Sequence, residues 1–369
     1  MSEKSSTMLL MGVGGAGCRI ARRIAESFNG PIKTLLVDTD DKSFDHSDSP
    51  CLLLGGERLS GRGAGGEIVS ARMAAEDSMG ALDKNLAGIR LACIVTGLGG
   101  GTGSGATYEI AKHLQQKLGI ACIVFATRPF SFEGEARHRN SRGMIPMIAE
   151  VASASFFQQL DKLAQNIDNM EQAMAKAIET LAASVTLFWR LIEKPGYIRL
   201  DSEKMRKLVQ GAGRGRFASV TFAGSDRARK CVDALSDSRL LSDGTNNVKS
   251  MLCGVLAGDD LRLSEIAQIA QGVQIAYGTN SDFELATVND EESFSGTLSV
   301  VLMLFENSPK ETLVAEKPAR GSRKTRSGKN ALAASPQGRG RFNNSAPTIW
   351  RGEDLDIPTY LRQNIILDF

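Results

Sequence analysis

The sequence predicts an α/β fold: an N-terminal doubly wound sheet, one long central helix and a smaller C-terminal α+β part. Three observations support this. Short apolar runs alternate with helical patterns in the first half of the chain, and they are expected as strands at residues 8–13, 33–37, 91–95 and 120–126. Apolar residues then recur at three- and four-residue steps from Ile167 to Glu193, until Pro195-Gly196 stops the helix. The apolar run 298–305 is expected as a closing strand.

The first expected strand leads into a glycine-rich turn and a helix. Gly12, Gly14 and Gly17 have the GxGxxG spacing, and the acidic pair Asp38 and Asp40 follows about 20 residues later, after the second strand. This pattern is typical of a Rossmann dinucleotide site. An NAD-binding oxidoreductase is therefore one functional hypothesis.

A second glycine-rich stretch, residues 96–105, holds six glycines in ten residues and precedes a helix expected from Ala106 to Leu114. Glycine lets the backbone approach a ligand closely, and a helix N-terminus attracts anions. Thr102 and Ser104 add hydroxyl donors, whereas no basic residue and no GxxxxGK[ST] motif is present. A flexible linker or a tight turn is the alternative. We favour a phosphate cradle, for which the NAD hypothesis has no use.

Composition narrows the other possibilities. The six cysteines show no CxxC pair and the three histidines lie far apart, so we expect reduced thiols, a cytosolic protein and no metal site built by side chains. We find no signal peptide and no apolar run long enough to span a membrane.

The basic charge of the chain is concentrated in one segment. Residues 308–349 hold nine Lys or Arg and two Glu, so this segment is +7 and the rest of the chain is −5. Its Ser-, Gly- and Pro-rich composition predicts a disordered linker, usually just solvated, although it could attract anionic lipid. We consider nucleic acid an unlikely partner. The apolar residues that follow predict a peptide that orders on a partner.

The stretch from Gly99 to Gly105 matches the GGGTGS/TG signature of the tubulin/FtsZ family. The resemblance, to a divergent bacterial FtsZ, extends over residues 8–306 and 352–363. It implies GTP-dependent head-to-tail polymerisation in the cytokinetic ring, in the cytoplasm at the division site. It also implies a GTPase site that the adjacent subunit completes.

The resemblance further implies GTP or GDP, with Mg²⁺, as cofactor. Glu133 would contact the ribose and Arg137 the phosphates, although without the family the two could simply form a solvent-exposed ion pair. The implied nucleotide-binding residues are Gly14, Gly15, Ala16, Gly17, Arg19, Asp40, Ala64, Gly65, Gly99, Gly100, Gly101, Thr102, Gly103, Ser104, Glu133, Arg137 and Glu179.

The base-binding positions depart from the family pattern. Arg19 stands where the family has an asparagine that reads guanine, and Glu179 aligns with the acid of the central helix that bonds the guanine edge. Arginine can stack on a purine or hydrogen-bond to it, but it supplies no acceptor oxygen. Guanine specificity is therefore expected but not secured by these residues.

The loop after the central helix departs as well. The family's NxDxxD motif helps to activate water; here Asp201 matches, but Arg199 replaces the Asn and Lys204 the second acid. Glu203 could swing into the acid position, or Arg199 could act as an arginine finger. The candidate catalytic residues are thus Asp201, Glu203 and Arg199. We expect slow hydrolysis, and a structural filament that barely hydrolyses GTP is the alternative.

The expected organisation has six parts: a disordered N-terminus, a GTP-binding domain, the central helix, an α+β domain, the linker and the tail. Their bounds are 1–7, 8–166, 167–194, 195–306, 307–348 and 349–369. The tail resembles the family's adaptor-binding motif, which implies binding to a membrane adaptor through Leu355, Asp356, Ile357, Pro358, Tyr360, Leu361 and Arg362.

Overall fold

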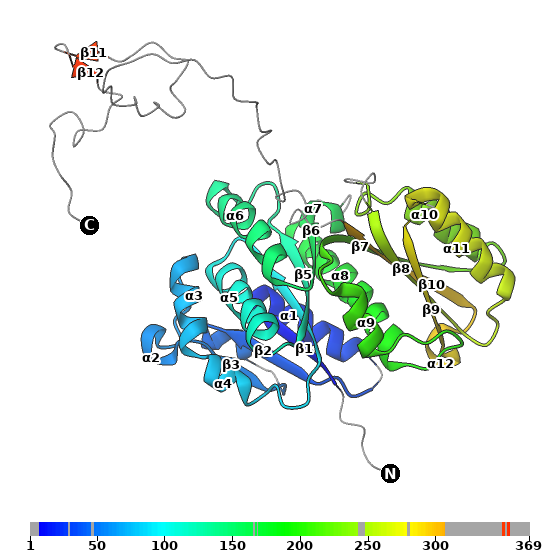
Figure 1. The fold of residues 1–369 in the computed structure, drawn as a ribbon, viewed down its shortest axis with the longest axis horizontal. Coiled ribbons are helices and arrows are strands. Elements are labelled where there is room, and N and C mark those ends of the chain that lie inside the picture. Colours follow the sequence, from blue (N-terminus) through cyan, green and yellow to red (C-terminus); the bar gives the residue numbers. More distant parts are fainter. Residues whose placement is uncertain are drawn as a thin grey trace, which may run out of the picture. The chain divides into compact units, whose positions relative to one another are not determined.

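A computed structural model describes residues 7–28, 30–45, 48–164, 167, 169–242, 248–278, 281–306, 349–350 and 353–354 (Figure 1). Residues 1–314 form one compact unit and residues 315–369 a second. In the second unit, β11 (Ile349–Trp350) pairs antiparallel with β12 (Glu353–Asp354). Nearly all of the expected disordered segments and the adaptor-binding residues lie outside the described residues, so those expectations remain predictions.

The described residues of the first unit form ten strands. They are β1 (Met8–Val13), β2 (Thr34–Asp38), β3 (Cys51–Leu53), β4 (Leu91–Gly97), β5 (Ala121–Arg128), β6 (Ala154–Gln159), β7 (Gly213–Ala223), β8 (Val248–Ala257), β9 (Asp282–Asn289) and β10 (Thr297–Glu306). The four strands expected in the first half are confirmed as β1, β2, β4 and β5, and the closing strand is β10.

The helices of this unit lie between and beside the strands. They are α1 (Gly14–Ser27), α2 (Gly56–Leu59), α3 (Ile68–Asp77), α4 (Met79–Asp83), α5 (Gly101–Lys112), α6 (Glu135–Val151), α7 (Leu160–Leu163), α8 (Met170–Glu193), α9 (Ser202–Val209), α10 (Arg227–Ser236), α11 (Leu263–Tyr277) and α12 (Glu291–Phe294). A 3₁₀ turn at Asp41–Phe44 and a π-helical turn at His113–Lys117 complete them.

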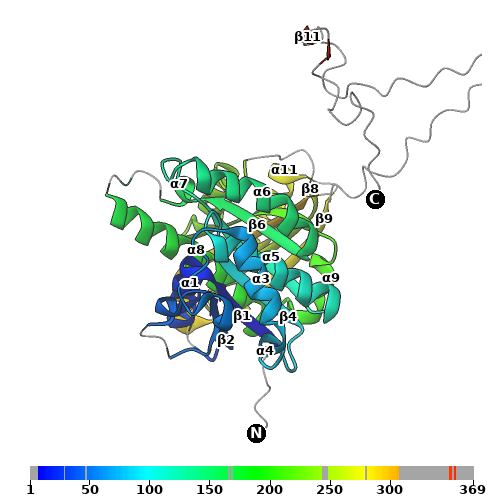
Figure 2. The same cartoon turned by 90° about the vertical axis from the view of Figure 1, so that its left-hand side faces the viewer.

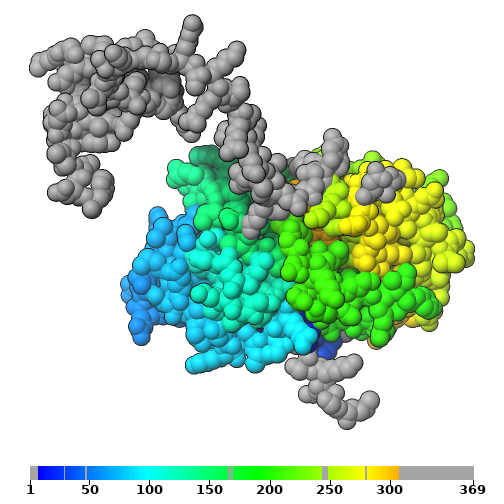
Figure 3. All heavy atoms as spheres, viewed as in Figure 1, coloured from blue at the N-terminus to red at the C-terminus, as the bar shows by residue number. Residues whose placement is uncertain are grey.

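All ten strands belong to one sheet, in the order β3-β2-β1-β4-β5-β6-β7-β10-β8-β9. Strands β3 to β7 pair in parallel, and β10 pairs antiparallel with β7 and β8. The link between the two halves is short, because β6 and β7 pair only over residues 154–156 and 213–215. In the space-filling view, the N-terminal half (blue to cyan) lies against the C-terminal half (green to yellow; Figure 3).

Helices cover both faces of the parallel half, as a doubly wound sheet requires (Figures 1 and 2). The strand β1 shows why: Met8 and Leu10 are buried with α1 and α8, whereas Leu9 and Met11 are buried with α3, α5 and α6. Strand residues alternate between faces, so a strand that is apolar throughout needs cover on both.

The central helix α8 follows the expected pattern but begins three residues later than expected, at Met170. The side chain of Asn169 caps it by accepting from the Gln172 amide at 3.0 Å. One apolar face of α8 packs with α1, β8 and β10, so this helix contributes to the cores of both halves.

The cysteines agree with the expectation for thiols. Cys18, Cys93, Cys122, Cys231 and Cys253 are free and buried, whereas Cys51 is free and exposed. Burial raises the pKa of the Cys18 thiol to about 12, so this neighbour of the first glycine turn is an unreactive core residue.

Candidate functional site

Both glycine-rich stretches lie at one edge of the parallel sheet. β1 pairs directly with β4, with Val13 beside Thr96, so the turns that leave these strands are neighbours. The strand order reverses between β1 and β4, and such a switch point is where α/β sheets bind ligands. A cavity of about 250 Å³ lies there, lined by both turns.

The second stretch differs from the expectation in one respect. The helix α5 begins at Gly101, not at Ala106, so its first turn is made of glycine, threonine and serine. The free N–H groups of α5 therefore belong to the glycine-rich stretch itself. Helix α1 likewise begins at Gly14, so two helix N-termini meet at the cavity.

Most of these glycines are required by packing. A Cβ on Gly103 would lie 2.1 Å from the Gly97 carbonyl oxygen, and one on Gly17 would lie 2.3 Å from the Val95 carbonyl oxygen. Gly14 has a φ of +75° and lies against the backbone of Gly103. The two turns thus touch through main-chain atoms, and side chains there would separate them.

Gly100 is different. A Cβ at this position would meet no atom within 4 Å, and the residue lines the cavity. Packing within the chain does not explain this glycine, whereas close approach of a ligand would. The cavity wall here is backbone, which suits an anion held by main-chain amides.

Hydroxyl groups fasten the two turns together. The Thr96 hydroxyl lies 3.0 Å from the carbonyl oxygens of both Val13 and Gly103. The Thr102 hydroxyl lies 2.6 Å from that of Thr39. The Ser104 hydroxyl accepts from the Gly99 amide at 2.9 Å and is buried, so the structure does not bring Ser104 to the cavity.

Two arginines and one acid line the cavity. The Arg137 guanidinium donates to Glu133 at 2.6 Å, and Glu133 also accepts from the Phe130 amide at 2.9 Å. Arg19 lies on the first turns of α1. Of the expected residues, those that line the cavity are Gly14, Gly15, Ala16, Arg19, Gly100, Gly101, Thr102, Gly103, Glu133 and Arg137.

Other expected residues support the cavity from behind. Ala64 packs on Gly101, whose added Cβ would lie 3.0 Å away. Asp40 caps the 3₁₀ turn by accepting from Lys42. The remaining expected residues outside the lining are Gly17, Gly65, Gly99, Ser104 and Glu179.

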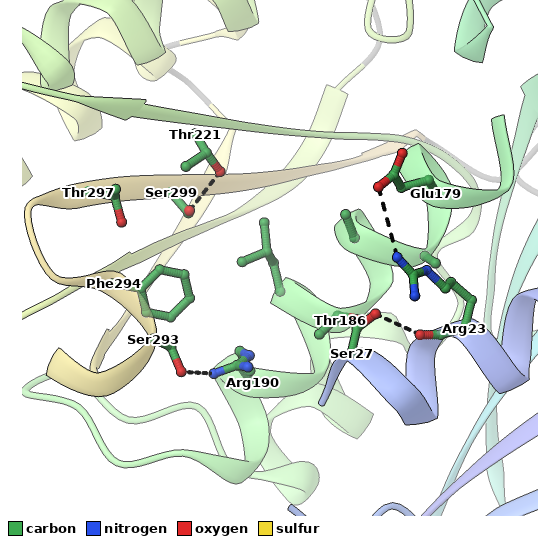
Figure 4. Close-up of a pocket in the computed structure, with 13 residues that line it drawn as sticks. Arg23, Ser27, Glu179, Thr186, Arg190, Thr221, Ser293, Phe294, Thr297 and Ser299 are labelled. Atoms are coloured by element: carbon green, nitrogen blue, oxygen red, sulfur yellow. Dashed lines mark hydrogen bonds and ion pairs between the residues drawn. The ribbon is translucent and has the colours of Figure 1, made fainter. Parts of the chain in front are cut away.

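Glu179 lies at a different cavity. A Glu179 oxygen lies 3.9 Å from an Arg23 guanidinium nitrogen, and both residues line a cleft between α1, α8 and strands β7 and β10 (Figure 4). The cleft has a volume of about 450 Å³ and is therefore larger than the first cavity. Because its lining includes no glycine turn, size alone would have pointed to the wrong place for phosphates.

Buried charge holds that cleft together at its other end. The Arg190 guanidinium of α8 donates to Ser293 at 2.6 Å (Figure 4). It also donates to Asp290 at 3.0 Å and lies over the rings of Phe28 and Phe294. Since Phe28 belongs to the first half and Asp290 to the second, this arginine ties the two halves.

Several contributing residues were not predicted as site residues. Ile20, Leu160, Met174 and Ile178 give the cavity an apolar section where α1, α7 and α8 meet. Helical spacing in the sequence marks three of them, Ile20, Met174 and Ile178, only as apolar helix positions. The side chain of Asn140 donates to the carbonyls of Gly66 and Gly99, at 3.3 and 3.1 Å. No sequence pattern marks this asparagine.

The loop after α8 is fastened to β9. The Thr287 amide donates to the Ile198 carbonyl at 2.9 Å, and the Ile198 amide donates to the Thr287 hydroxyl at 2.9 Å. A Cβ on Gly196 would lie 1.7 Å from the Thr287 carbonyl oxygen. The position of this loop is therefore fixed by backbone contacts.

Two of the three candidate catalytic residues of this loop form hydrogen bonds within the chain. Asp201 caps α9 by accepting from the Lys204 amide at 2.7 Å, and the Lys204 ammonium pairs with Glu284. Arg206 holds Glu203 with two hydrogen bonds, at 3.0 and 2.7 Å, and this pairing lowers the pKa of Glu203. Arg199 is exposed.

The described residues include no group of three or more His, Cys, Asp or Glu that could hold a metal ion. Mg²⁺ in nucleotide sites takes its ligands largely from phosphates and water, with one or two protein oxygens. A Mg²⁺ ion that arrived with phosphates would need few protein ligands here; Thr102 lines the cavity, and its hydroxyl lies 2.6 Å from that of Thr39. No helix in the described part of the chain is long and apolar enough to cross a bilayer.

Comparison with known proteins identifies the family of this chain. Residues 7–168 match the model of the Tubulin/FtsZ family, GTPase domain. The chain is 31% identical to the cell division protein FtsZ of Methanothermobacter thermautotrophicus over 276 residues, which cover 74% of this chain and 72% of the relative. It is 28% identical to that of Coxiella burnetii, over 79% of this chain and 76% of the relative.

Solved structures show the same fold. The structure resembles an empty FtsZ dimer of M. jannaschii with a TM-score of 0.76 and 24% identity, over 84% of this chain and 90% of that chain. It also resembles a GTPγS-bound protofilament of CetZ2 from Haloferax volcanii, with a TM-score of 0.69 and 20% identity, over 83% and 95%. The assignment replaces the NAD-dependent oxidoreductase hypothesis and explains both glycine turns. The chain belongs to the tubulin/FtsZ family, a family of GTPases.

Proposed function

We propose that this chain binds GTP and GDP between its two glycine-rich turns and polymerises head to tail into filaments that serve cell division. Hydrolysis of GTP is slow, and the loop of the adjacent subunit completes the site. The proposal agrees with the relatives named cell division protein FtsZ and with the related CetZ2 structure, which is described as a protofilament.

The observation that carries this proposal is the separation of two necessary parts. The nucleotide cavity touches the first turns of α8, through Met174 and Ile178, whereas Arg199 and Asp201 follow the other end of that helix. The 15 residue steps from Ile178 to Glu193 extend about 22 Å along the helix. A loop fastened to β9 cannot cross that distance, so a second copy must supply it.

This arrangement leads to an open polymer. Each copy offers a cavity at one end of α8 and a loop at the other, so the contacting surfaces differ. Contacts between different surfaces of identical subunits form rings or open filaments. The cavity of the last subunit remains free to accept the next loop.

The cradle supports phosphate binding through main-chain groups. The N-termini of α1 and α5 aim partial positive charge and free amides at one cavity, and Arg137 adds a cation. Bound Mg²⁺ would neutralise charge on the phosphates. Glu133 is held by Phe130 and Arg137, so it presents a fixed carboxylate to the ribose.

Slow hydrolysis is supported by the charges of the loop. The position expected to hold a second acid carries Lys204, which pairs with Glu284, so no carboxylate is offered there. Glu203 is one residue early and is held by Arg206 with two hydrogen bonds. Arg199 could instead stabilise charge on the transferring phosphoryl group. A filament that assembles but barely hydrolyses GTP is the limiting case.

The tail supports a role at the membrane only through its sequence. Residues 355–362 lie outside the described residues, and we propose that they bind a membrane adaptor at the division site. The linker of residues 307–348 would set the reach of this contact.

The test is a sedimentation assay with phosphate release measured in the same tube. We expect GTP to drive pelleting, GDP to leave the protein in the supernatant, and phosphate to appear slowly. Pelleting with GTP would support nucleotide-driven filament assembly at any rate of phosphate release. Equal sedimentation with GTP, GDP and no nucleotide would refute assembly, and fast turnover would refute the argument from Lys204.

A further inference from the structure

One section of the nucleotide cavity is apolar. Ile20 of α1, Leu160 of α7, and Met174 and Ile178 of α8 line it together. The glycine turns form the other section, where amides and helix dipoles favour phosphate. A purine ring is flat with apolar faces, so the apolar section is where the base of a bound nucleotide belongs.

Arg19 places hydrogen-bond donors beside this section. Arg19 precedes Ile20 on α1, is exposed and lines the cavity. Across the described residues its guanidinium forms no ion pair and no side-chain hydrogen bond. The Arg19 side chain is therefore available as a donor beside the base. It offers up to five N–H groups and no acceptor.

The acidic residues that adjoin this section in sequence are turned elsewhere, since Asp161 accepts from the Ser131 amide and hydroxyl and Glu179 of α8 pairs with Arg23. Ile178 lines the nucleotide cavity, but its neighbour Glu179 lines the other cleft. Figure 4 shows Glu179 and Arg23 pointing toward each other, and the two charged groups are 3.9 Å apart. The α8 wall thus offers the base apolar contact without a carboxylate.

We propose that Arg19 selects the purine by donating two hydrogen bonds to the O6 and N7 acceptors of a 6-keto base. The inference rests on the proposed nucleotide binding and deepens it. A planar guanidinium matches these two acceptors in a bidentate geometry. Adenine offers N7 but replaces O6 with an amino donor, which faces the arginine unfavourably.

Recognition by Arg19 and recognition by a carboxylate differ in whether the base needs its 2-amino group. A carboxylate would read the N1–H and 2-amino donors of guanine, so it would require the 2-amino group. Arg19 reads only O6 and N7, so the 2-amino group is not required. Inosine triphosphate, which keeps O6 and N7 but lacks the 2-amino group, binds as guanosine triphosphate does.

The experiment measures four dissociation constants on the full-length protein, by competition with a ribose-labelled fluorescent GTP analogue. The competitors are GTP, ITP, ATP and 2-aminopurine riboside triphosphate, which keeps the 2-amino group and lacks O6. We expect ITP within about twofold of GTP. We expect the other two to bind roughly 5- to 150-fold more weakly, the range given by one bidentate pair.

Variants identify the residue responsible. Arg19→Met keeps a long apolar stem and should bring GTP and ITP down to the level of ATP. Arg19→Lys keeps the charge but loses the planar fork, so it should lose most of the selectivity as well. Arg22→Met is the matched control on the same helix, because Arg22 bonds the Asp45 carbonyl and does not line the cavity.

The variant Glu179→Gln distinguishes recognition by Arg19 from recognition by an acid. If Arg19 reads the base, the ratio of GTP to ITP affinity in this variant should equal that of the wild type. The inference is overturned if ITP binds at least fivefold more weakly than GTP in the wild type. It is also overturned if Arg19→Met lowers all four affinities equally, as a purely electrostatic attraction for phosphates would. Failure of every nucleotide to bind would instead overturn the proposed function, and the inference with it.

Discussion

The nucleotide cradle and the loop after α8 are built in opposite ways. The cradle consists of main-chain atoms in close contact, with Gly103 and Gly97 so near that no side chain fits between them. The loop presents charged side chains on a fixed backbone, and Asp201, Glu203 and Lys204 are each engaged by a neighbour. Substitution at most glycines of the cradle disturbs packing, whereas substitution of Arg199 or Lys204 in the loop chiefly changes charge.

This difference teaches that binding and hydrolysis are physically separable in this chain. The amides that hold phosphate are fixed by β1, β4, α1 and α5, on which the core of the first half depends. Of the carboxylates that would activate water, Asp201 is exposed and Glu203 is half-buried. A protein of this design can lose turnover while it retains nucleotide binding.

The largest expected effect comes from Gly103→Ala in the cradle. Its Cβ would lie 2.1 Å from the Gly97 carbonyl oxygen, so the backbone of the second glycine-rich stretch must change its conformation. We expect a loss of roughly 3 kcal/mol in the free energy of unfolding, together with loss of GTP binding. Urea denaturation of the ligand-free protein measures the first and fluorescent GTP titration the second.

Gly100→Ala is the matched control for stability. The added Cβ meets no atom within 4 Å, so the free energy of unfolding should change by less than about 0.5 kcal/mol. Equal destabilisation by the two substitutions would show that packing does not distinguish these glycines.

The next effect concerns turnover. Arg199→Asn combined with Lys204→Asp restores the acidic pattern of the loop, and it should raise phosphate release about tenfold or more. GTP affinity of the isolated subunit should not change, because the loop lies at the far end of α8. Lys207→Asp repeats the charge change of Lys204→Asp on α9 outside the motif and should leave turnover unchanged. A double variant as slow as the wild type would contradict the charge argument.

A smaller effect is expected from Arg206→Gln, which releases Glu203. Glu203 lies one residue before the position where the family has its second acid, so we expect it not to replace that acid. Turnover should therefore rise by less than about threefold. Phosphate release per polymerised subunit measures this. A rise comparable to that of the double variant would instead identify Glu203 as the functional acid.

The smallest effect is electrostatic. Hydrogen bonding to Arg206 lowers the pKa of Glu203 below its usual value of 4.5. The pair therefore stabilises the fold above that pH, and the contribution is lost as the pH falls through the lowered pKa. In an NMR titration of the carboxyl carbon, the midpoint should lie below 4.5 in the wild type and move upward in Arg206→Gln. An unchanged midpoint would show that the pair does not persist in solution.

Local patterns were sufficient for the elements of the cradle. The strands β1, β2, β4 and β5 are apolar runs between turn signals, and the glycine turns follow two of them. Patterns did not predict that α5 begins at Gly101, because glycine has a low helix propensity. The close fit of Gly103 and Gly105 against neighbouring backbone overrides that propensity.

The directions of side chains could not be predicted in the same way. Ser104 turns inward to the Gly99 amide, and Glu179 turns toward Arg23, because each follows a partner from another part of the structure. Asn140 joins two turns from within an ordinary helix. Such roles depend on tertiary contacts, which periodicity and composition do not contain.

The length of α8 has a geometric consequence for assembly. Its 24 residues form a rod about 36 Å long, with the base-binding wall near its beginning and the charged loop just beyond its end. In the proposed filament, where the loop of one copy would enter the cavity of the next, this rod would set the spacing between successive nucleotides. The length of α8 would then determine the axial repeat of the filament. Inserting or deleting one helical turn in α8 would change this repeat by about 5.4 Å.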